Sequence, residues 1–267
     1  MPGKRRSTWY DERLGRRMRH QRGFPPLSFS LLILSASCFS APGSRNAPVD
    51  APGSSLVAPR NGEGNPSASA EDEWVIDNIT SIHGLRPTVL GAPVTTATDQ
   101  GQALCFDGDD GILLAKNPLE GLAEFTLQIL FRCDPLTSAQ AALAEPRFLH
   151  IETEAASRAT VEARVTETSF ALDTFLRSGS QSRTLLDAAK RHPVAVWHWA
   201  ALTYGDGQMR HYVDGVEDAA GPLSLMPFGP GKTSIGVRQN FVHWFKGCVR
   251  KLRISPRALP PERLEKL

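Results

Sequence analysis

Two glutamates near the middle of the chain could perform acid–base chemistry. Glu152 and Glu154 stand two residues apart in an extended segment, and a strand would place both on one face with Cα atoms about 6.6 Å apart. Retaining glycosidases use two carboxyl groups about 5–5.5 Å apart. A glycoside hydrolase built on this pair is one hypothesis. The alternative is a solvated polar face, on which Glu162 and Arg164 of the next strand provide cross-strand charge pairing.

Three aspartates could hold a metal ion. Asp107, Asp109 and Asp110 stand close together in an acidic, glycine-containing turn between two apolar segments. Their oxygens suit Ca²⁺, which takes about six to eight oxygen ligands. Aspartate side chains also bond to nearby backbone amides in ordinary turns. Turn chemistry is the preferred interpretation, with a structural Ca²⁺ as the alternative and no other cofactor indicated.

A polar segment at residues 238–244 contains the best candidates for ligand binding. Trp244 lies there with His243, Asn240 and Arg238. An aromatic ring flanked by hydrogen-bonding groups suits stacking on a sugar or anchoring a protein partner, and loops on a rigid scaffold often carry such sites. The alternative is that Trp244 only caps a sheet edge.

Other chemistries lack their sequence signatures. The seven histidines show no metal-binding pair, and there is no nucleophile elbow, dinucleotide fingerprint or complete phosphate-binding loop. The net charge is only +2, and much of the basic charge gathers near the N-terminus. Without a concentrated basic stripe in the remainder, nucleic acid is not an expected partner.

The N-terminal part indicates export. Residues 27–39 form an apolar run behind a basic leader, too short for a membrane span and typical of a secretory signal. We expect a leader over residues 1–41, with translation starting at Met18, and a disordered Pro/Gly/Ser-rich spacer over 42–72. Cys38 follows a loose lipobox, so simple export and a lipid anchor both remain open, and an extracytoplasmic location is expected.

The rest of the chain has the sequence pattern of an all-β domain. Residues 125–131 alternate cleanly, and residues 193–216 contain aromatic-rich segments closed by Asp-Gly turns, the strongest short-range signal for hairpins. Turn signals recur along the chain, and no long segment has a helical period. Trp197 and Trp199 share one strand face and are expected to pack rather than to bind.

Three blocks in order carry a family resemblance. They are residues 103–110 followed by 125–127, residues 197–215, and residues 245–259. Together they resemble the laminin-G-like, concanavalin A-like jelly-roll domain of exported bacterial proteins over about residues 74–264. The resemblance implies an antiparallel two-sheet jelly-roll sandwich that binds carbohydrate or protein, in some members with a structural Ca²⁺.

The chain departs from the family pattern in informative places. Arg250 stands where the closing strand commonly has Asp, which weakens the case for calcium there. His211 stands where an apolar residue is usual, which makes its ring a candidate ligand-binding group at a sheet surface. A satisfied, partly buried histidine is the preferred interpretation. The closely spaced acidic signature of concanavalin-like glucanases is absent.

We therefore predict a sandwich domain over residues 73–267 that acts as a non-catalytic binding module. Carbohydrate is the first expected ligand and a surface protein the second, for which the domain would serve in adhesion or assembly. A glycoside hydrolase is the remaining alternative.

The cysteines after the leader allow at most one disulfide and one free thiol, and we expect all of them to be small buried hydrophobes: Cys105, Cys133 and Cys248.

Overall fold

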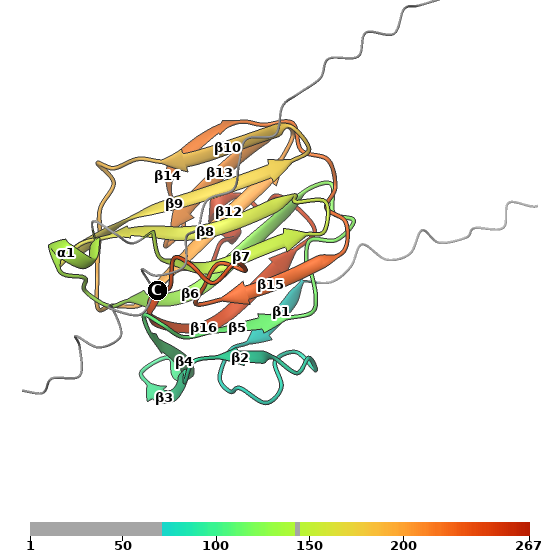
Figure 1. The fold of residues 1–267 in the computed structure, drawn as a ribbon. Helices are drawn as coiled ribbons and strands as arrows, with labels where there is room; N and C mark the ends of the chain where they lie inside the picture. Colours follow the sequence, from blue (N-terminus) through green and yellow to red (C-terminus); the bar gives the residue numbers. More distant parts are fainter. Residues whose placement is uncertain (1–70, 142–144) are drawn as a thin grey trace, which may run out of the picture. The chain divides into compact units, whose positions relative to one another are not determined.

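The computed structural model describes residues 71–141 and 145–267. The predicted leader, nearly all of the predicted spacer and Cys38 lie outside these residues. The described chain folds into two eight-stranded sheets packed face to face, in which every strand pairs antiparallel with its neighbours (Figure 1). The predicted all-β, antiparallel sandwich is confirmed. Among the described residues, no helix is long and apolar enough to cross a bilayer.

One sheet, here called the β12 sheet, contains the central meander and the last strand of the chain. Its order is β14 (Val216–Pro222), β13 (Gln208–Val213), β12 (His198–Gly205), β6 (Phe125–Cys133), β16 (Lys246–Ser255), β4 (Gly101–Asp107) and β3 (Val94–Thr98), with β1 (Asp72–Val75) also paired to β16.

The other sheet, here called the β9 sheet, is built largely from hairpins. Its order is β10 (Gln181–Leu186), β9 (Ser169–Ser178), β8 (Arg158–Val165), β7 (Arg147–Thr153), β15 (Gly231–Ile235), β5 (Gly111–Leu114) and β2 (Thr88–Leu90), with β11 (His192–Pro193) paired to β9. The only helical pieces in the described chain are short, α1 (Ser138–Ala141) and a 3₁₀ turn at Pro261–Arg263.

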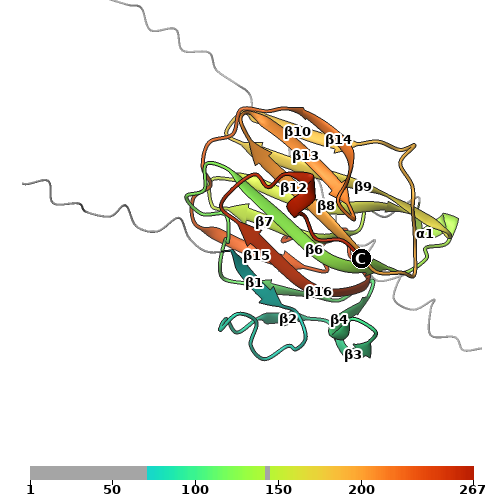
Figure 2. The same cartoon turned by 180° about the vertical axis from the view of Figure 1, so that it is seen from behind.

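Alternation along β6 places one side in the core between the sheets. Phe125, Leu127, Ile129 and Phe131 are all almost fully buried there, as the period of two predicts. Most of the opposite side of β6 is buried as well, because the C-terminal segment crosses one part of it (Figure 2) and the two tryptophans described below cover Leu130. Glu265, for example, donates its backbone N–H to the Gln128 side chain at 2.7 Å. A half-buried strand was the expectation, and the C-terminal segment and the tryptophans are the reason for the difference.

Trp197 and Trp199 pack on the outer side of the β12 sheet, each only 6% exposed. They form a small apolar cluster with Leu130 and Cys248, which confirms the packing interpretation.

The expectation that every cysteine is an unpaired hydrophobe is wrong in part, since Cys248 faces Cys105 across the β16–β4 ladder in a disulfide. Cys133 is a free, buried thiol.

Candidate functional site

The predicted binding segment, residues 238–244, is a compact loop between β15 and β16. It is closed by the Arg238 N–H, which donates to the Val242 carbonyl at 3.2 Å, and by the Phe241 N–H, which donates to the Arg238 carbonyl at 2.8 Å. Phe241 and His243 have φ angles of 62° and 58°, a region that non-glycine residues seldom adopt. The loop therefore holds an unusual backbone shape.

The same loop is fastened to β7 of the β9 sheet. The Arg147 N–H donates to the His243 carbonyl at 3.1 Å, and the Gln239 N–H donates to His150 Nδ1 at 3.3 Å. His150 is fully buried, and burial lowers its pKa to about 3, with help from the Arg158 charge. A neutral ring that accepts at Nδ1 carries its proton on Nε2, which lies 3.6 Å from Glu152 Oε2.

The loop brings the four predicted binding residues into one place with different exposures. Arg238, His243 and Trp244 are partly buried, and Asn240 is exposed. The prediction omitted Phe241, which is 52% exposed. A large aromatic residue inside a polar loop is a signal that the sequence did contain.

Arg238 is an unpaired cation within this loop. Within residues 71–141 and 145–267, its guanidinium has neither an ion pair nor a hydrogen bond. Its pKa is lowered, first by burial and then by the positive charges of Arg158 and Arg147. Since an arginine side chain stays charged in proteins, the loop keeps a cation with unused donors.

Charged side chains cover the outer face of the β9 sheet beside the loop. Arg147 Nε lies 2.6 Å from Glu162 Oε2, and Arg164 reaches both Glu145, at 2.6 Å, and Asp173, at 2.8 Å. The side chains of Glu162 and Asp173 are 5% and 0% exposed and stand directly opposite each other on β8 and β9. Burial raises both pKa values, and that of Glu162 reaches about 7 even though Arg147 lowers it.

The predicted carboxylate pair is divided between a strand and a turn. β7 ends at Thr153, so Glu152 lies on the strand, whereas Glu154 is an exposed turn residue. The expectation that both share one strand face is therefore wrong. Glu152 forms a 2.6 Å ion pair with Arg158, its cross-strand neighbour on β8. Charge pairing across this hairpin was expected, but the turn is shorter than predicted and the partner differs.

His211 does not reach a sheet surface. It is fully buried and faces the core, where its Nδ1 lies 2.9 Å from the Thr174 hydroxyl of the opposite sheet. Burial lowers its pKa to about 4, so the ring is neutral at physiological pH. His211 is a polar bridge between the sheets, and the expectation that its ring is available to a ligand is wrong.

The three aspartates do gather, with ligand oxygens within 4.8 Å of one another. Asp110 accepts the Asp107 N–H at 3.3 Å and the Ala92 N–H at 3.4 Å, and Asp107 accepts the Asp109 N–H at 3.2 Å. Burial raises the pKa of Asp110. These are the bonds of an aspartate turn, and they use carboxylate oxygens that a cation would need. Calcium binding here stays a prediction.

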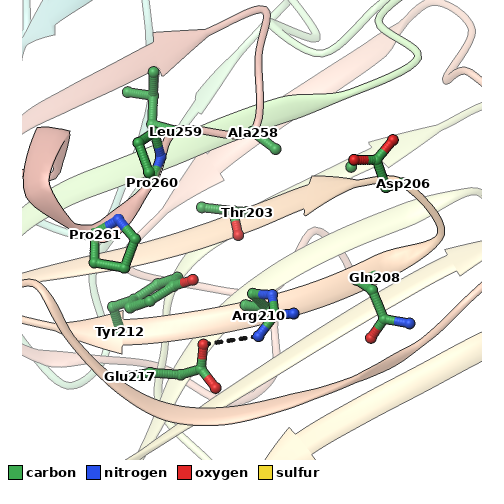
Figure 3. Close-up of a pocket in the computed structure, with 11 residues that line it drawn as sticks. Thr203, Asp206, Gln208, Arg210, Tyr212, Glu217, Ala258, Leu259, Pro260 and Pro261 are labelled. Atoms are coloured by element: carbon green, nitrogen blue, oxygen red, sulfur yellow. Dashed lines mark hydrogen bonds and ion pairs between the residues drawn. The ribbon is translucent and has the colours of Figure 1, made fainter.

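A pocket lies on the opposite side of the molecule, on the outer face of the β12 sheet (Figure 3). Its volume is about 310 Å³, and it lies between β12–β14 and the C-terminal residues 258–261. The sequence analysis missed it, because its polar residues approach the C-terminal segment only in the folded chain. Alternation of Gln208, Arg210 and Tyr212 was the sole local signal that these side chains share a face.

Comparisons with solved structures find the same fold at low identity. Domain 4 of AbnA, a GH43 extracellular arabinanase from Geobacillus stearothermophilus, in complex with arabinotriose, matches with a TM-score of 0.53 and 17% identity, over 72% of this chain and 94% of that one. The botulinum neurotoxin serotype G binding domain matches with a TM-score of 0.55 and 9% identity, over 71% and 48%. The binding domain of botulinum neurotoxin DC in complex with SialylT gives 0.52 and 10%, over 72% and 49%.

This chain spans about half the length of the two neurotoxin domains. A comparison with curated protein sequences finds no match. A family model, Laminin_G_3, described as the concanavalin A-like lectin/glucanases superfamily, matches residues 106–265, which is more than half of the chain. That stretch contains most strands of both sheets, including the predicted loop and the pocket. The protein therefore belongs to the concanavalin A-like lectin/glucanases superfamily.

Proposed function

We propose that this protein is a non-catalytic carbohydrate-binding module whose binding site is the 238–244 loop. The observation that carries the proposal is the unpaired guanidinium of Arg238 in a loop that also presents Trp244 and Phe241. Aromatic rings offer apolar faces to the C–H groups of a sugar, and a few well-placed polar groups fix its orientation. The bonds to His150 and Arg147 hold the loop before any ligand arrives, which lowers the entropic cost of binding.

The free cation favours a sugar that carries a carboxylate or sulfate. A guanidinium matches such groups with two parallel hydrogen bonds. The neighbouring arginines Arg147 and Arg158 already have carboxylate partners, so Arg238 is the arginine of this group that remains available to a ligand. An acidic glycan would also relieve the repulsion that these neighbours exert on Arg238.

The similar structures support a search among sugars, although fold alone does not establish function. One of them is described in complex with arabinotriose and another in complex with SialylT. Glycoside hydrolysis by Glu152 and Glu154 has less support, because Glu152 is engaged by Arg158 and Glu154 lies in a turn. A role outside the cytoplasm accords with the predicted export signal, with or without a lipid anchor at Cys38.

A protein ligand is the second candidate function. Phe241 and the adjacent Val242 are 52% and 40% exposed, and exposed apolar side chains on a loop suit an interface core. A surface protein would use the same loop in adhesion or assembly. The two candidates differ in whether glycans bind at all.

A glycan array probed with the full chain tests the proposal. We expect binding to acidic glycans, weakened at least tenfold by Arg238→Gln and by Trp244→Ala, without turnover of the bound sugars. Arg86→Gln is the matched control, because Arg86 is an exposed arginine outside the loop. Binding that survives both loop substitutions would contradict the assignment of the site. A silent array, together with capture of a surface protein that requires Phe241, would favour the second candidate.

A further inference from the structure

We propose that the pocket on the outer face of the β12 sheet is a separate site for an uncharged sugar ring. Its volume of about 310 Å³ lies at the lower end of the range for small-molecule sites, about 300–1,000 Å³. The site lies on the sheet opposite the one that anchors the 238–244 loop. Binding at this pocket therefore does not depend on the function proposed for the loop.

The polar side of the pocket is an exposed ion pair. Arg210 Nη1 lies 3.0 Å from Glu217 Oε2, and the two side chains are 43% and 40% exposed. Such a pair contributes little to stability. The Arg210 guanidinium keeps further N–H donors, and the Glu217 carboxylate, which also bonds to the Tyr212 hydroxyl, keeps further lone pairs as acceptors beside them. Two neighbouring hydroxyls of a sugar can each accept a hydrogen bond from the Arg210 guanidinium and donate one to the Glu217 carboxylate. They would replace the water that otherwise bonds to this exposed ion pair.

Other polar groups surround this pair. Figure 3 shows Thr203 between Arg210 and the C-terminal segment, with Asp206 and Gln208 toward the β12–β13 turn. They add a hydroxyl, a carboxylate and an amide, all of which bond to hydroxyl groups. Asp206 has a φ of 51° in that turn. Among the described residues, its side chain forms no ion pair and no hydrogen bond.

The opposite side of the pocket is apolar and fixed. It consists of residues 258–261, Ala-Leu-Pro-Pro, which Figure 3 shows facing the strand residues. The Leu259 N–H donates to the Thr126 hydroxyl at 2.8 Å, and Ala258 packs so closely on Gly205 that a Cβ there would lie 2.5 Å from the Ala258 Cβ. Proline rings and an alanine methyl offer C–H surfaces against which the apolar face of a sugar ring can lie.

The charges of the pocket argue for a neutral ligand. Arg210 is neutralised by Glu217, and the remaining formal charge in the lining is the negative charge of Asp206. An anion would meet repulsion there. Asp206 is exposed and solvated, so it does not require a cationic partner. A neutral polyol can use all of the donors and acceptors without bringing a charge of its own.

Calorimetric and NMR titrations of the full chain with arabinotriose, xylotriose, mannotriose and cellotriose test this inference. We expect at least one of them to bind with a Kd on the order of 1 mM and to shift the Tyr212 resonances. Glu217→Ala should weaken that binding at least tenfold, and Gln208→Trp should abolish it by filling the pocket. Arg238→Gln and the matched exposed-acid control Glu154→Ala should leave it unchanged.

Two results would overturn the inference. One is that none of the four trisaccharides binds or shifts pocket resonances. The other is that binding survives both Glu217→Ala and Gln208→Trp in variants whose thermal unfolding matches the wild type. Loss of acidic-glycan binding in Arg238→Gln with unchanged trisaccharide binding would separate this site from the loop.

Discussion

The outer faces of the two sheets are covered by different kinds of residue. On the β9 sheet, carboxylates with less than a tenth of their surface exposed, such as Glu162 and Asp173, are each matched by an arginine. On the β12 sheet, Trp197, Trp199 and the C-terminal segment cover much of the outer face, and its ion pairs, such as Lys251–Glu73, are partly exposed. A buried charge is tolerated only with a partner, whereas apolar cover needs none.

The difference has a functional consequence. Arg147, Arg158 and Arg164 of the β9 sheet each have a carboxylate partner, whereas Arg238, in the loop after β15, has none. Covering the β12 sheet with a chain segment leaves a gap between that segment and the strands, where the only charged pair is already neutral. The first arrangement favours an anionic ligand and the second an uncharged one.

Removing the disulfide would test the cover of the β12 sheet and should have the largest effect. Cys105 and Cys248 are 143 residues apart in sequence, and a cross-link over such a loop restricts the unfolded chain, typically by 2–4 kcal/mol in free energy. We expect the Cys105→Ser/Cys248→Ser variant to lose about 3 kcal/mol of unfolding free energy, measured by urea titration under oxidising conditions. Acidic-glycan binding by the folded variant should not change. A loss below about 1 kcal/mol would contradict the expectation.

The charged face of the β9 sheet should give stability a pH dependence. The pKa of Glu162 is about 7 in the folded protein, against 4.5 as its ordinary value. The folded state therefore holds this proton more tightly, and the resulting stability is present below pH 4.5 and is lost as pH rises toward 7. Arg147, Arg164, Asp173 and Glu145 are the charged groups that face it.

The Glu162→Gln variant isolates this contribution. As the pH rises from 5 to 8, the wild type should lose about 2 kcal/mol of unfolding free energy relative to the variant. The reason is that Glu162 loses its proton over this range, whereas a glutamine has no proton to lose. Urea unfolding at both pH values measures the difference, and Glu154→Gln, at an exposed turn, is the control. A wild-type-minus-variant difference that stays constant with pH would refute the raised pKa.

Phe241 should affect binding and not stability. Its side chain is 52% exposed, so Phe241→Ala should change the unfolding free energy by less than about 0.5 kcal/mol. We expect affinity at the loop to fall about tenfold, which corresponds to about 1.4 kcal/mol. Titration of the variant with the best array ligand measures this. Unchanged affinity would restrict the site to Arg238 and Trp244.

Calcium should have the smallest effect. The Asp107–Gly111 turn links β4 of one sheet to β5 of the other, and its aspartates already accept backbone N–H groups. We expect 2 mM Ca²⁺ or EDTA to move the thermal midpoint by less than about 1 °C, since a ligand stabilises only when it binds the folded state. A rise of several degrees with Ca²⁺ would establish the alternative of a structural ion.

Local patterns in the sequence predicted the fold well and the site only partly. The alternation of Phe125, Leu127, Ile129 and Phe131 identified a core face, because a strand's period depends on neighbouring residues. The Cys105–Cys248 pairing depends on the register between β4 and β16, which no local pattern encodes. The C-terminal cover that buries part of the second side of β6 is equally long-range.

The errors at the site have similar causes. Glu154 was expected on a strand, but the β7–β8 turn begins earlier and leaves it outside. His211 was a candidate for a sheet surface because it replaces an apolar residue of the family pattern, yet it lies in the core. There its Nδ1 bonds to Thr174 of the opposite sheet, and its Nε2 has no hydrogen-bond partner among the described residues. The 238–244 loop was predicted as a candidate because its composition is unusual in itself, whereas the unpaired state of Arg238 depends on contacts in the folded chain.

The most direct test of the central claim is a titration of the full chain with an oligogalacturonide and with its carboxyl-reduced, neutral counterpart, for the wild type and Arg238→Gln. We expect the wild type to bind the acidic sugar at least tenfold more tightly than the neutral one, and the variant to lose that preference. Equal affinity of the wild type for the two sugars, or a preference that survives in Arg238→Gln, would contradict the account.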